Sequence, residues 1–240
     1  MFEETADIET ASLDYARRFS GTTGKWLLSR QTEILLDMVS EFQDATVLDV
    51  GGGHGQIAFP LCQRGFKLTV TGSSQECSFL IKELIENKSC DFVIADNINL
   101  PFPDNSFDIV TCFRLICHCN SWQKLIKELC RVARSCVIAD YPTIYSVNLL
   151  APKMFKLKKK IEGNTRIFTL FTHREIIDTF KREGFECLER KGEFFFPLAL
   201  HRALKSKYIS TILEAPFRYL RITDLIGSPV IVKMGRNKRN

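Results

Sequence analysis

Four glycines crowd one short stretch of the sequence, V-L-D-V-G-G-G-H-G-Q, which runs from Val47 to Gln56. The stretch follows a run of β-branched and apolar residues and opens a helical pattern, so it predicts a turn between a strand and a helix. Gly51, Gly53 and Gly55 let the backbone turn sharply and approach a ligand that a side chain would block. We therefore predict a ligand-binding loop; the alternative is a tight turn that binds nothing.

The spacing of the glycines and one nearby acid narrow the class of ligand. A dinucleotide fingerprint requires its third glycine at position 56, where this sequence has Gln56, and this weakens a hydride-transfer function. Asp49 lies two residues before Gly51 at the end of the predicted strand. Its carboxylate can orient the loop and bind an ammonium group through water, but it would repel a pyrophosphate.

Alternating patterns place this loop in an α/β fold, because short apolar runs alternate with stretches of helical period. Strands are predicted over residues 46–50, 67–72, 91–95, 107–113, 136–140, 185–196 and 229–234. Helices are predicted over residues 55–64, 76–87, 122–132, 172–182 and 198–222, after an N-terminal helical stretch with Ile34, Leu35, Met38, Val39 and Phe42 on one face. Thr172 followed by Glu175 predicts a capping box at the start of the helix over 172–182. We expect a Rossmann-like, doubly wound, mainly parallel seven-stranded sheet with N-terminal helices and a helical insertion before the last strand.

The chain is expected to form a single domain, because 240 residues, 45% of them apolar, suffice for one core. Its expected parts are an N-terminal helical cap (1–44), a ligand-binding core (45–141), a lid candidate (142–171) and C-terminal strands with the helical insertion (172–240). The nine cysteines include no C-x-x-C pair, and the N-terminus has no apolar segment. A cytoplasmic protein with free thiols is therefore expected.

Two further stretches carry a resemblance to a known family. Residues 95–110, A-D-N-I-N-L-P-F-P-D-N-S-F-D-I-V, match the family block A-D-x-x-x-L-P-F-P-D-x-S-F-D-x-V, and residues 125–134, L-I-K-E-L-C-R-V-A-R, match its following helix. The chain resembles the class I S-adenosylmethionine-dependent methyltransferases, of the small-molecule type that includes ubiquinone and menaquinone biosynthesis enzymes. The likeness is strong from about residue 46 to residue 140 and weak outside.

The resemblance implies S-adenosyl-L-methionine as cofactor and assigns residues to it. The three loop glycines would pass under its methionine part, Asp96 would accept a hydrogen bond from the adenine amine, and Asn97 would flank the ring. An aspartate at a strand end can accept from an exocyclic amine, although it can also cap a turn. Phe113 lies where the family places a residue near the sulfonium, and that position also suits a core residue.

One departure concerns the ribose. The family usually ends its second strand with an acid that binds both ribose hydroxyls, whereas the matching residue in V-T-G-S-S-Q-E is Ser74. A serine supplies no bidentate charged acceptor, so charge-assisted bonds worth about 1.5 to 3 kcal/mol each are weakened or lost. Either Glu76 reaches the ribose, or affinity is lower, or the chain is a non-catalytic cofactor-binding scaffold.

The cofactor carries an electrophilic methyl group, so the protein has to align a nucleophile for in-line displacement and exclude water. An acceptor that must lose a proton needs one base. His118, five residues past the fourth strand, is the best placed residue for this role, and its alternative is a loop residue without catalytic function. Tyr141, Asp140 and His173 are lesser candidates.

Other patterns exclude several acceptors. The stretch T-C-F-R lacks the N/D-P-P-Y/F run of enzymes that methylate amino groups of DNA, and Cys112 follows threonine rather than the proline expected of a cytosine-attacking thiol. The group Cys112, Cys117, His118 and Cys119 lacks a second C-x-x-C half, so no metal site is predicted.

The acceptor itself is predicted only by class. The lid candidate and the run F-F-F at 194–196 mix aromatic side chains with lysines, which favours a small, apolar or aromatic acceptor with a negative group; the alternative is aromatic residues that seal the core. The basic run at 153–160 and the tail at 235–240 also allow weak contact with a membrane surface. The net charge of +5 is too small to indicate nucleic-acid binding, and it keeps RNA or protein only as an alternative acceptor.

Overall fold

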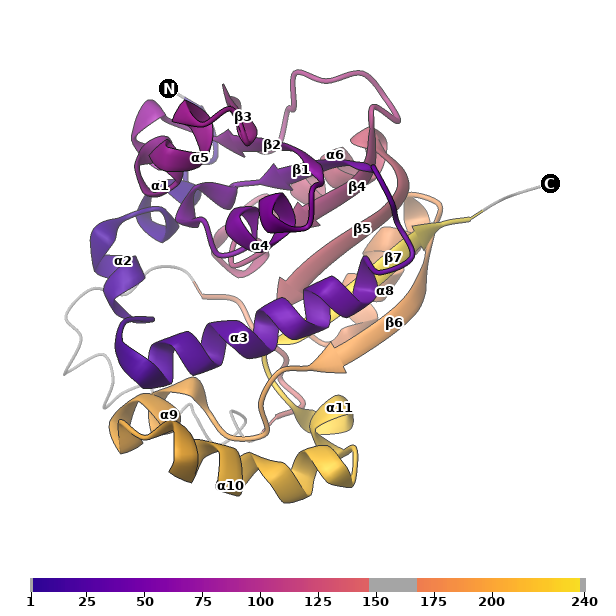
Figure 1. Cartoon of the computed structure of the whole chain (residues 1–240). Helices are drawn as coiled ribbons and strands as arrows, with labels where there is room; N and C mark the ends of the chain where they lie inside the picture. Colours follow the sequence, from indigo (N-terminus) through magenta and orange to yellow (C-terminus); the bar gives the residue numbers. More distant parts are fainter. Residues whose placement is uncertain (1, 147–167, 238–240) are drawn as a thin grey trace.

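A seven-stranded sheet forms the centre of the computed structural model, which describes residues 2–146 and 168–237 (Figure 1). The strand order is β3-β2-β1-β4-β5-β7-β6. The first five strands are parallel, and β7 is antiparallel to both β5 and β6. Their bounds are β1 Thr46–Val50, β2 Lys67–Gly72, β3 Cys90–Ile94, β4 Phe107–Cys112, β5 Ala133–Tyr141, β6 Phe185–Gly192 and β7 Val230–Arg236. This confirms the predicted doubly wound, mainly parallel sheet.

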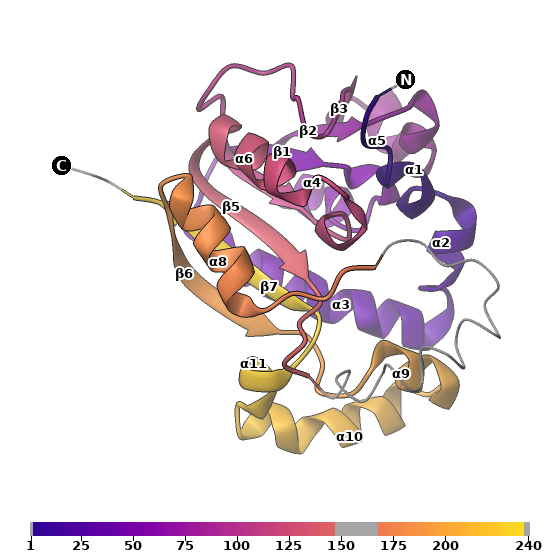
Figure 2. The same cartoon turned by 180° about the vertical axis from the view of Figure 1, so that it is seen from behind.

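Helices cover both faces of the sheet, as Figures 1 and 2 show from opposite sides. On one face lie α3 (Gly21–Met38), α4 (Ala58–Gln63) and α5 (Lys82–Glu86); on the other lie α6 (Trp122–Val132) and α8 (His173–Arg182). Successive strand residues point to opposite faces, so Val47 joins the apolar cluster under α3 while Leu48 joins the cluster under α6. The capping box predicted at the start of α8 is confirmed, with Thr172 and Glu175 hydrogen-bonded reciprocally.

The C-terminal insertion differs from the single helix predicted over 198–222. It forms α9 (Leu198–Leu204), α10 (Lys207–Tyr219) and α11 (Ile222–Ile226). Lys205 and Arg221 adopt the left-handed backbone, with φ of 50° and 57°, and this conformation ends a right-handed helix. The preceding strand also ends at Gly192, earlier than predicted.

The structure describes the N-terminal cap from residue 2 onward but only the two ends of the lid candidate. The cap contains α1 (Asp7–Thr10) and α2 (Leu13–Arg17) before α3. Residues 147–167, with the basic run at 153–160, and residues 238–240 lie outside the described residues. The described ends of the lid candidate lie together, because the Ile144 N–H donates to the Phe171 carbonyl and the Phe171 N–H donates to the Pro142 carbonyl. Within the described ranges, no helix is long and apolar enough to cross a membrane.

Candidate active site

The glycine loop lies at the carboxyl end of β1, where it forms the short 3₁₀ helix η1 (Gly52–His54). Gly51 and Gly55 adopt φ of 68° and 74°, a conformation that glycine reaches without strain. A Cβ on Gly53 would lie 2.1 Å from the carbonyl oxygen of Cys77 in η2 (Gln75–Ile81). The close approach of η2 therefore requires glycine at position 53 even without a ligand. This agrees with the alternative that the loop is a tight turn that binds nothing.

Asp49 lies fully buried beneath the loop. Its Oδ1 accepts a hydrogen bond of 2.8 Å from the Thr111 hydroxyl, and its Oδ2 has no hydrogen-bond partner among the described residues. Burial raises the pKa of Asp49 to about 7, and the Thr111 hydroxyl opposes this rise. The unpaired oxygen leaves one acceptor for a donor that arrives at the loop.

The end of β3 carries a second set of unsatisfied atoms. Asp96 Oδ1 accepts from the Ile98 N–H at 3.1 Å, which is the turn-capping geometry of its alternative role. Asn97 is fully buried, and neither its amide oxygen nor its amide nitrogen has a partner within the described ranges. An unmade buried hydrogen bond costs about 1 to 3 kcal/mol, so this amide indicates a ligand edge that offers both a donor and an acceptor.

At the end of β2, the structure places a carboxylate that sequence reasoning missed. Ser74 is half-buried and its hydroxyl accepts from the Glu76 N–H, while the Glu76 side chain is exposed. Asp7 of α1 is fully buried at this same edge. Its carboxylate accepts from the Ser73 N–H and the Ser73 hydroxyl, both at 2.6 Å, and from the Cys77 thiol at 3.3 Å.

Asp7 also lies over the glycine loop, because a Cβ on Gly51 would lie 3.4 Å from the Asp7 Cβ and 2.7 Å from Leu115 Cδ2. Nearby, Glu4 Oε2 accepts from the N–H groups of Asn120 and Ser121. The N-terminal segment therefore covers the carboxyl edge of the sheet. No local pattern could reveal this, since Asp7 and Ser73 are 66 positions apart.

A second polar cluster surrounds Arg114, just past the end of β4. Arg114 has a φ of 58° and is almost fully buried. Its guanidinium donates twice to Gln31 Oε1 of α3, at 3.2 and 2.7 Å, and lies 4.0 Å from Glu193 Oε2. Its backbone N–H donates to Asp140 Oδ1 at 2.6 Å. Arg114 thus connects the end of β4 with α3, with β5 and with the segment that follows β6. The sequence analysis did not predict this cluster.

Burial dominates the electrostatics of this cluster. It raises the pKa of Glu193 to about 8 although Arg114 opposes the rise, and it raises the pKa of Asp140 against the same opposition. Burial also lowers the pKa of His54 to about 4, with Arg114 adding to the effect, so His54 is neutral at pH 7. Since His54 Nδ1 accepts from the Gln56 N–H, its Nε2 carries the proton and donates to the Phe113 carbonyl.

The remaining predicted residues lie apart from one another, except for Tyr141 and His173. The Phe113 ring is fully buried in the apolar cluster under α3, so only its backbone faces His54. His118 ends η3 (Ile116–His118), and its ring packs against Phe168 with centroids 5.6 Å apart. Tyr141 and His173 come together, with the phenol oxygen 3.0 Å from Nδ1, and burial lowers the pKa of His173 to about 4.

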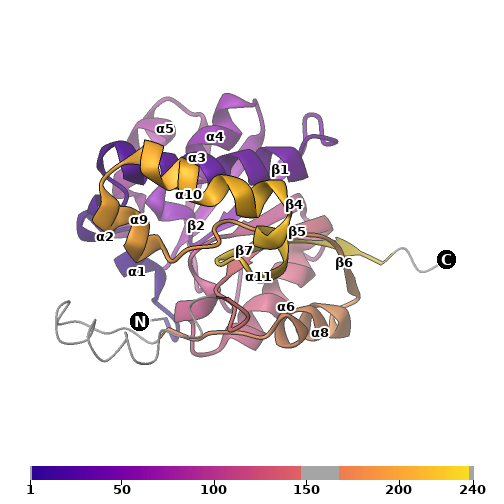
Figure 3. The same ribbon diagram turned by 90° about the horizontal axis from the view of Figure 1, so that it is seen from below.

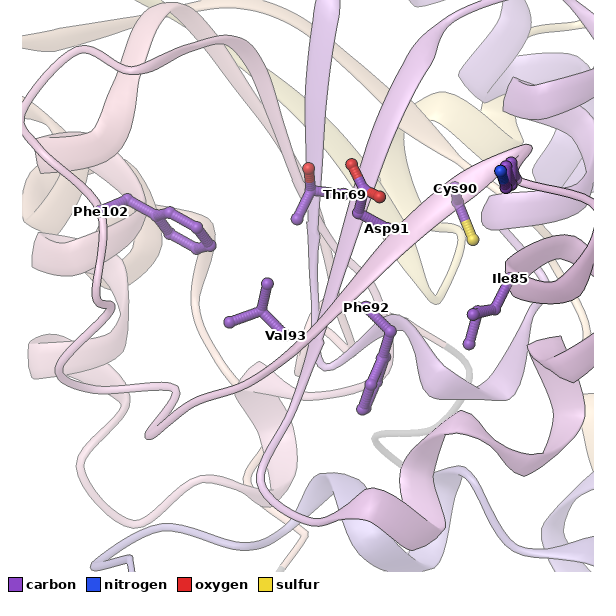
Figure 4. A pocket seen from close by; sticks show the side chains of 8 residues that line it. Thr69, Ile85, Cys90, Asp91, Phe92, Val93 and Phe102 are labelled. Atoms are coloured by element: carbon purple, nitrogen blue, oxygen red, sulfur yellow. The ribbon is translucent and has the colours of Figure 1, made fainter.

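A hollow of about 750 Å³ lies along the edge strand β3, and none of the predicted site residues lines it. Figure 4 shows Phe102 facing this strand across the hollow. All nine cysteines are free thiols, and in the described part of the chain no three His, Cys, Asp or Glu side chains gather as metal ligands would.

Comparison with known proteins identifies the core. Residues 48–136 match the family model described as a methyltransferase domain, which spans β1 to β5 with the glycine loop. The chain is 29% identical over 198 residues to a ubiquinone/menaquinone biosynthesis C-methyltransferase UbiE of Rickettsia bellii, covering 68% of this chain and 77% of the relative. Residues 48–136 are therefore a methyltransferase domain, and the relatives together with the fold support a class I S-adenosylmethionine-dependent methyltransferase.

A cycloartenol-C-24-methyltransferase of Arabidopsis thaliana is 28% identical over 191 residues, which cover 75% of this chain. The match spans only 56% of that protein's length. Both named methyltransferases act on small molecules. Their names do not identify the acceptor of this chain.

Solved structures share the methyltransferase fold. Magnesium protoporphyrin IX methyltransferase (ChlM) from Synechocystis, with bound SAH, superposes with a TM-score of 0.64 at 14% identity and 93% coverage of both chains. The [4+2]-cyclase SpnF superposes with a TM-score of 0.61 at 18% identity, covering 87% of this chain and 80% of its own. The cyclase shows that this fold also serves other chemistry.

S-adenosyl-L-methionine is the cofactor of the methyltransferase family, and the site of this chain fits it. The unpartnered Asn97 amide matches an adenine edge, which offers donors and acceptors together. The unpartnered Asp49 oxygen matches the ammonium group of an amino acid.

Proposed function

We propose that the chain transfers the methyl group of S-adenosyl-L-methionine to a small, apolar or aromatic acceptor. The observation that carries this proposal is the buried Asn97 amide, which has no partner among the described residues and lies within the segment matched to a methyltransferase domain. A buried amide without partners costs about 1 to 3 kcal/mol, and a ligand that hydrogen-bonds to it would recover this free energy.

The cofactor residues follow from their places at the strand ends. Asp49 and the loop glycines Gly51, Gly53 and Gly55 would hold the methionine part, Asp96 and Asn97 the adenine, and Ser74 the ribose. Phe113 would face the sulfonium through its backbone, because its ring is buried in the core. For this arrangement Asp7 has to share the space above Gly51 with the cofactor or leave it.

When bound, the cofactor presents a methyl group on a positive sulfur, and the acceptor's electron pair replaces the carbon–sulfur bond, whose electrons stay on the sulfur. His118 accepts the proton that the acceptor loses. Arg114 is a positioning residue, since it joins the ends of β4 and β5 beside the transfer site. The N-terminal segment, through Glu4 and Asp7, keeps water from the reacting atoms.

An aromatic cluster next to Glu193 supports the acceptor class. Phe195 stacks on Phe217 of α10 with centroids 3.7 Å apart, and Phe194 packs on Trp26 of α3 at 5.3 Å. Phe194 is fully buried in a small apolar cluster with Leu27, so only the half-buried rings of Phe195 and Phe196 could contact an apolar acceptor.

Calorimetric titration with S-adenosylhomocysteine tests the cofactor site. We expect binding to the intact chain and at least about tenfold weaker binding to Asn97→Leu. The substitution removes the proposed hydrogen bonds between the Asn97 amide and the adenine, and a tenfold loss corresponds to about 1.4 kcal/mol. The matched control is Asn99→Leu, an exposed neighbour on the same turn, which should bind as the unaltered chain does. Failure of the intact chain to bind would reject the function.

Radiolabelled methyl transfer in a cell extract then tests the acceptor. Label is expected in the solvent-extractable fraction, and His118→Gln should lower its rate by about a hundredfold or more if His118 is the base. Label found only in RNA or protein would overturn the acceptor class. Cofactor binding without transfer to any fraction would favour a non-catalytic scaffold.

A further inference from the structure

Exposed apolar side chains concentrate on the insertion between β6 and β7. Sixteen large apolar residues are exposed in the described part of the chain, and eight of them lie between positions 200 and 226. They are Leu200, Tyr208, Ile209, Ile212, Tyr219, Leu220, Leu225 and Ile226. Single exposed apolar residues scattered over a surface are normal in proteins. The concentration of half of these exposed residues on one short insertion needs an explanation.

Helix α10 carries polar side chains on its buried side and apolar side chains on its exposed side. Its buried side carries Ser210 and Glu214, and the Glu214 carboxylate accepts from the N–H groups of Phe195 and Phe196. Its outer side carries Tyr208, Ile212 and Tyr219, which are 72%, 71% and 87% exposed. Spacings of four and seven place these three on one face. Folding alone gives no reason for an apolar stripe on the solvent side.

Cations outnumber anions beside this stripe. Lys205, Lys207 and Arg221 are exposed at the two ends of α10. The acids of the described insertion are Glu214, which is buried, and Asp224, which is half-buried and lies 3.5 Å from Arg221. A basic rim around an apolar stripe complements a surface that is both anionic and apolar.

We propose that the outer face of α10, continued by α11, docks on an anionic lipid membrane. Figure 3, seen from below, shows α10 across the near face of the molecule, and α10 packs on α3 and α9 on its inner side. Tyr208 and Tyr219 suit the headgroup region, because a tyrosine ring is apolar and its hydroxyl is polar. None of the residues of this surface belongs to the basic run at 153–160, and the proposal does not depend on the methyl-transfer reaction.

A second copy of the chain fits this surface less well. Both ends of α10 are basic, so two such helices packed against each other would oppose cations in either orientation. Lipid phosphates supply the opposite charge, and acyl chains cover the apolar stripe.

Flotation of the full chain with lipid vesicles tests the proposal. We expect binding to vesicles of phosphatidylcholine and phosphatidylglycerol in equal parts, and about tenfold weaker binding to phosphatidylcholine alone or at high salt. Ile212→Glu and the double variant Lys205→Glu/Lys207→Glu should each lower binding about tenfold. The matched control is Leu188→Glu on β6, where the leucine is 62% exposed, and it should bind as the unaltered chain does.

Other outcomes overturn the proposal. Failure of the intact chain to float with either vesicle, or equal flotation of Ile212→Glu, would reject the membrane. A dimer in sedimentation analysis that Ile212→Glu dissociates would assign the surface to a second copy. Circular dichroism and a thermal unfolding midpoint equal to that of the unaltered chain show that each exposed variant remains folded.

Discussion

The two halves of the carboxyl edge are built differently. On the cofactor half, at the ends of β1 and β3, Asp49 and Asn97 keep buried polar atoms without partners among the described residues. On the half proposed to bind the acceptor (the acceptor half), Arg114 donates to Gln31 Oε1 and Asp140 Oδ1 and lies 4.0 Å from Glu193 Oε2. The Gln31 amide nitrogen and both Glu193 carboxyl oxygens also lack hydrogen-bond partners among the described residues. Both halves therefore keep buried polar atoms that a ligand could pair, but the second half is organised around a buried cation that joins distant elements.

The largest effect is expected where the acceptor half loses its cation. Arg114→Met would leave Gln31 Oε1 without its donor and Asp140 without the cation that offsets its burial, which should lower the free energy of unfolding by about 3 to 5 kcal/mol. Chemical denaturation measures this change. The matched control is Arg134→Met, because Arg134 pairs with Asp108 at an exposed site and should cost about 1 kcal/mol or less. Equal losses in both variants would contradict a special role of Arg114.

The same cluster should make stability depend on pH through Glu193. Its folded pKa of about 8 lies above that of an unfolded glutamate, so the folded chain binds more protons between these values. The free energy of unfolding should then fall as the pH rises through this window, by on the order of a few kcal/mol. Glu193→Gln should remove this contribution.

Denaturation of both proteins at several pH values tests this prediction. Burial also raises the pKa values of Asp49 and Asp140. The contribution of Asp49 should cancel in the difference between the two proteins, whereas Asp140 adds to the raised pKa of Glu193, so the difference reports Glu193 together with its interaction with Asp140. A difference between Glu193→Gln and the unaltered chain that stays constant from about pH 5 to about pH 8 would mean that Glu193 is ionised throughout.

On the cofactor half, Gly53→Val should damage both stability and binding. Its Cβ would approach the Cys77 carbonyl oxygen to 2.1 Å, so the loop or η2 must move. We expect a loss of about 1 to 3 kcal/mol in the free energy of unfolding together with loss of S-adenosylhomocysteine binding. Thermal unfolding and calorimetry measure the two effects. Unchanged stability with lost binding would instead mean that position 53 faces the ligand alone.

The sequence predicted the parts of the molecule that depend on neighbouring residues. The bounds of β1 and β2 and the capping box at Thr172 and Glu175 agree with the structure, because strand patterns and helix caps are local. The breaks at Lys205 and Arg221 could not be predicted, since neither residue type favours the left-handed backbone.

The candidate site divides in the same way. Asp49 and the glycine loop were found from a few adjacent letters, and Asn97 from a block of adjacent family residues. Asp7 and Arg114 act through partners 66 and 83 positions away, and no periodicity or motif records such pairs. A prediction of the acceptor half from one sequence therefore required the fold itself.

The smallest effect is expected for the affinity for S-adenosylhomocysteine when Ser74, at the proposed ribose position, is replaced. Ser74→Asp restores the acid that the family has at the end of β2, and it should tighten S-adenosylhomocysteine binding by about tenfold. The carboxylate of Asp7 already lies at this edge, 2.6 Å from the Ser73 N–H, and would repel a second acid. The double variant Asp7→Asn/Ser74→Asp should therefore bind more tightly than Ser74→Asp alone. If calorimetry gave the unaltered affinity for both variants, Ser74 would not face the ribose, and the alignment of β2 with the family would be wrong.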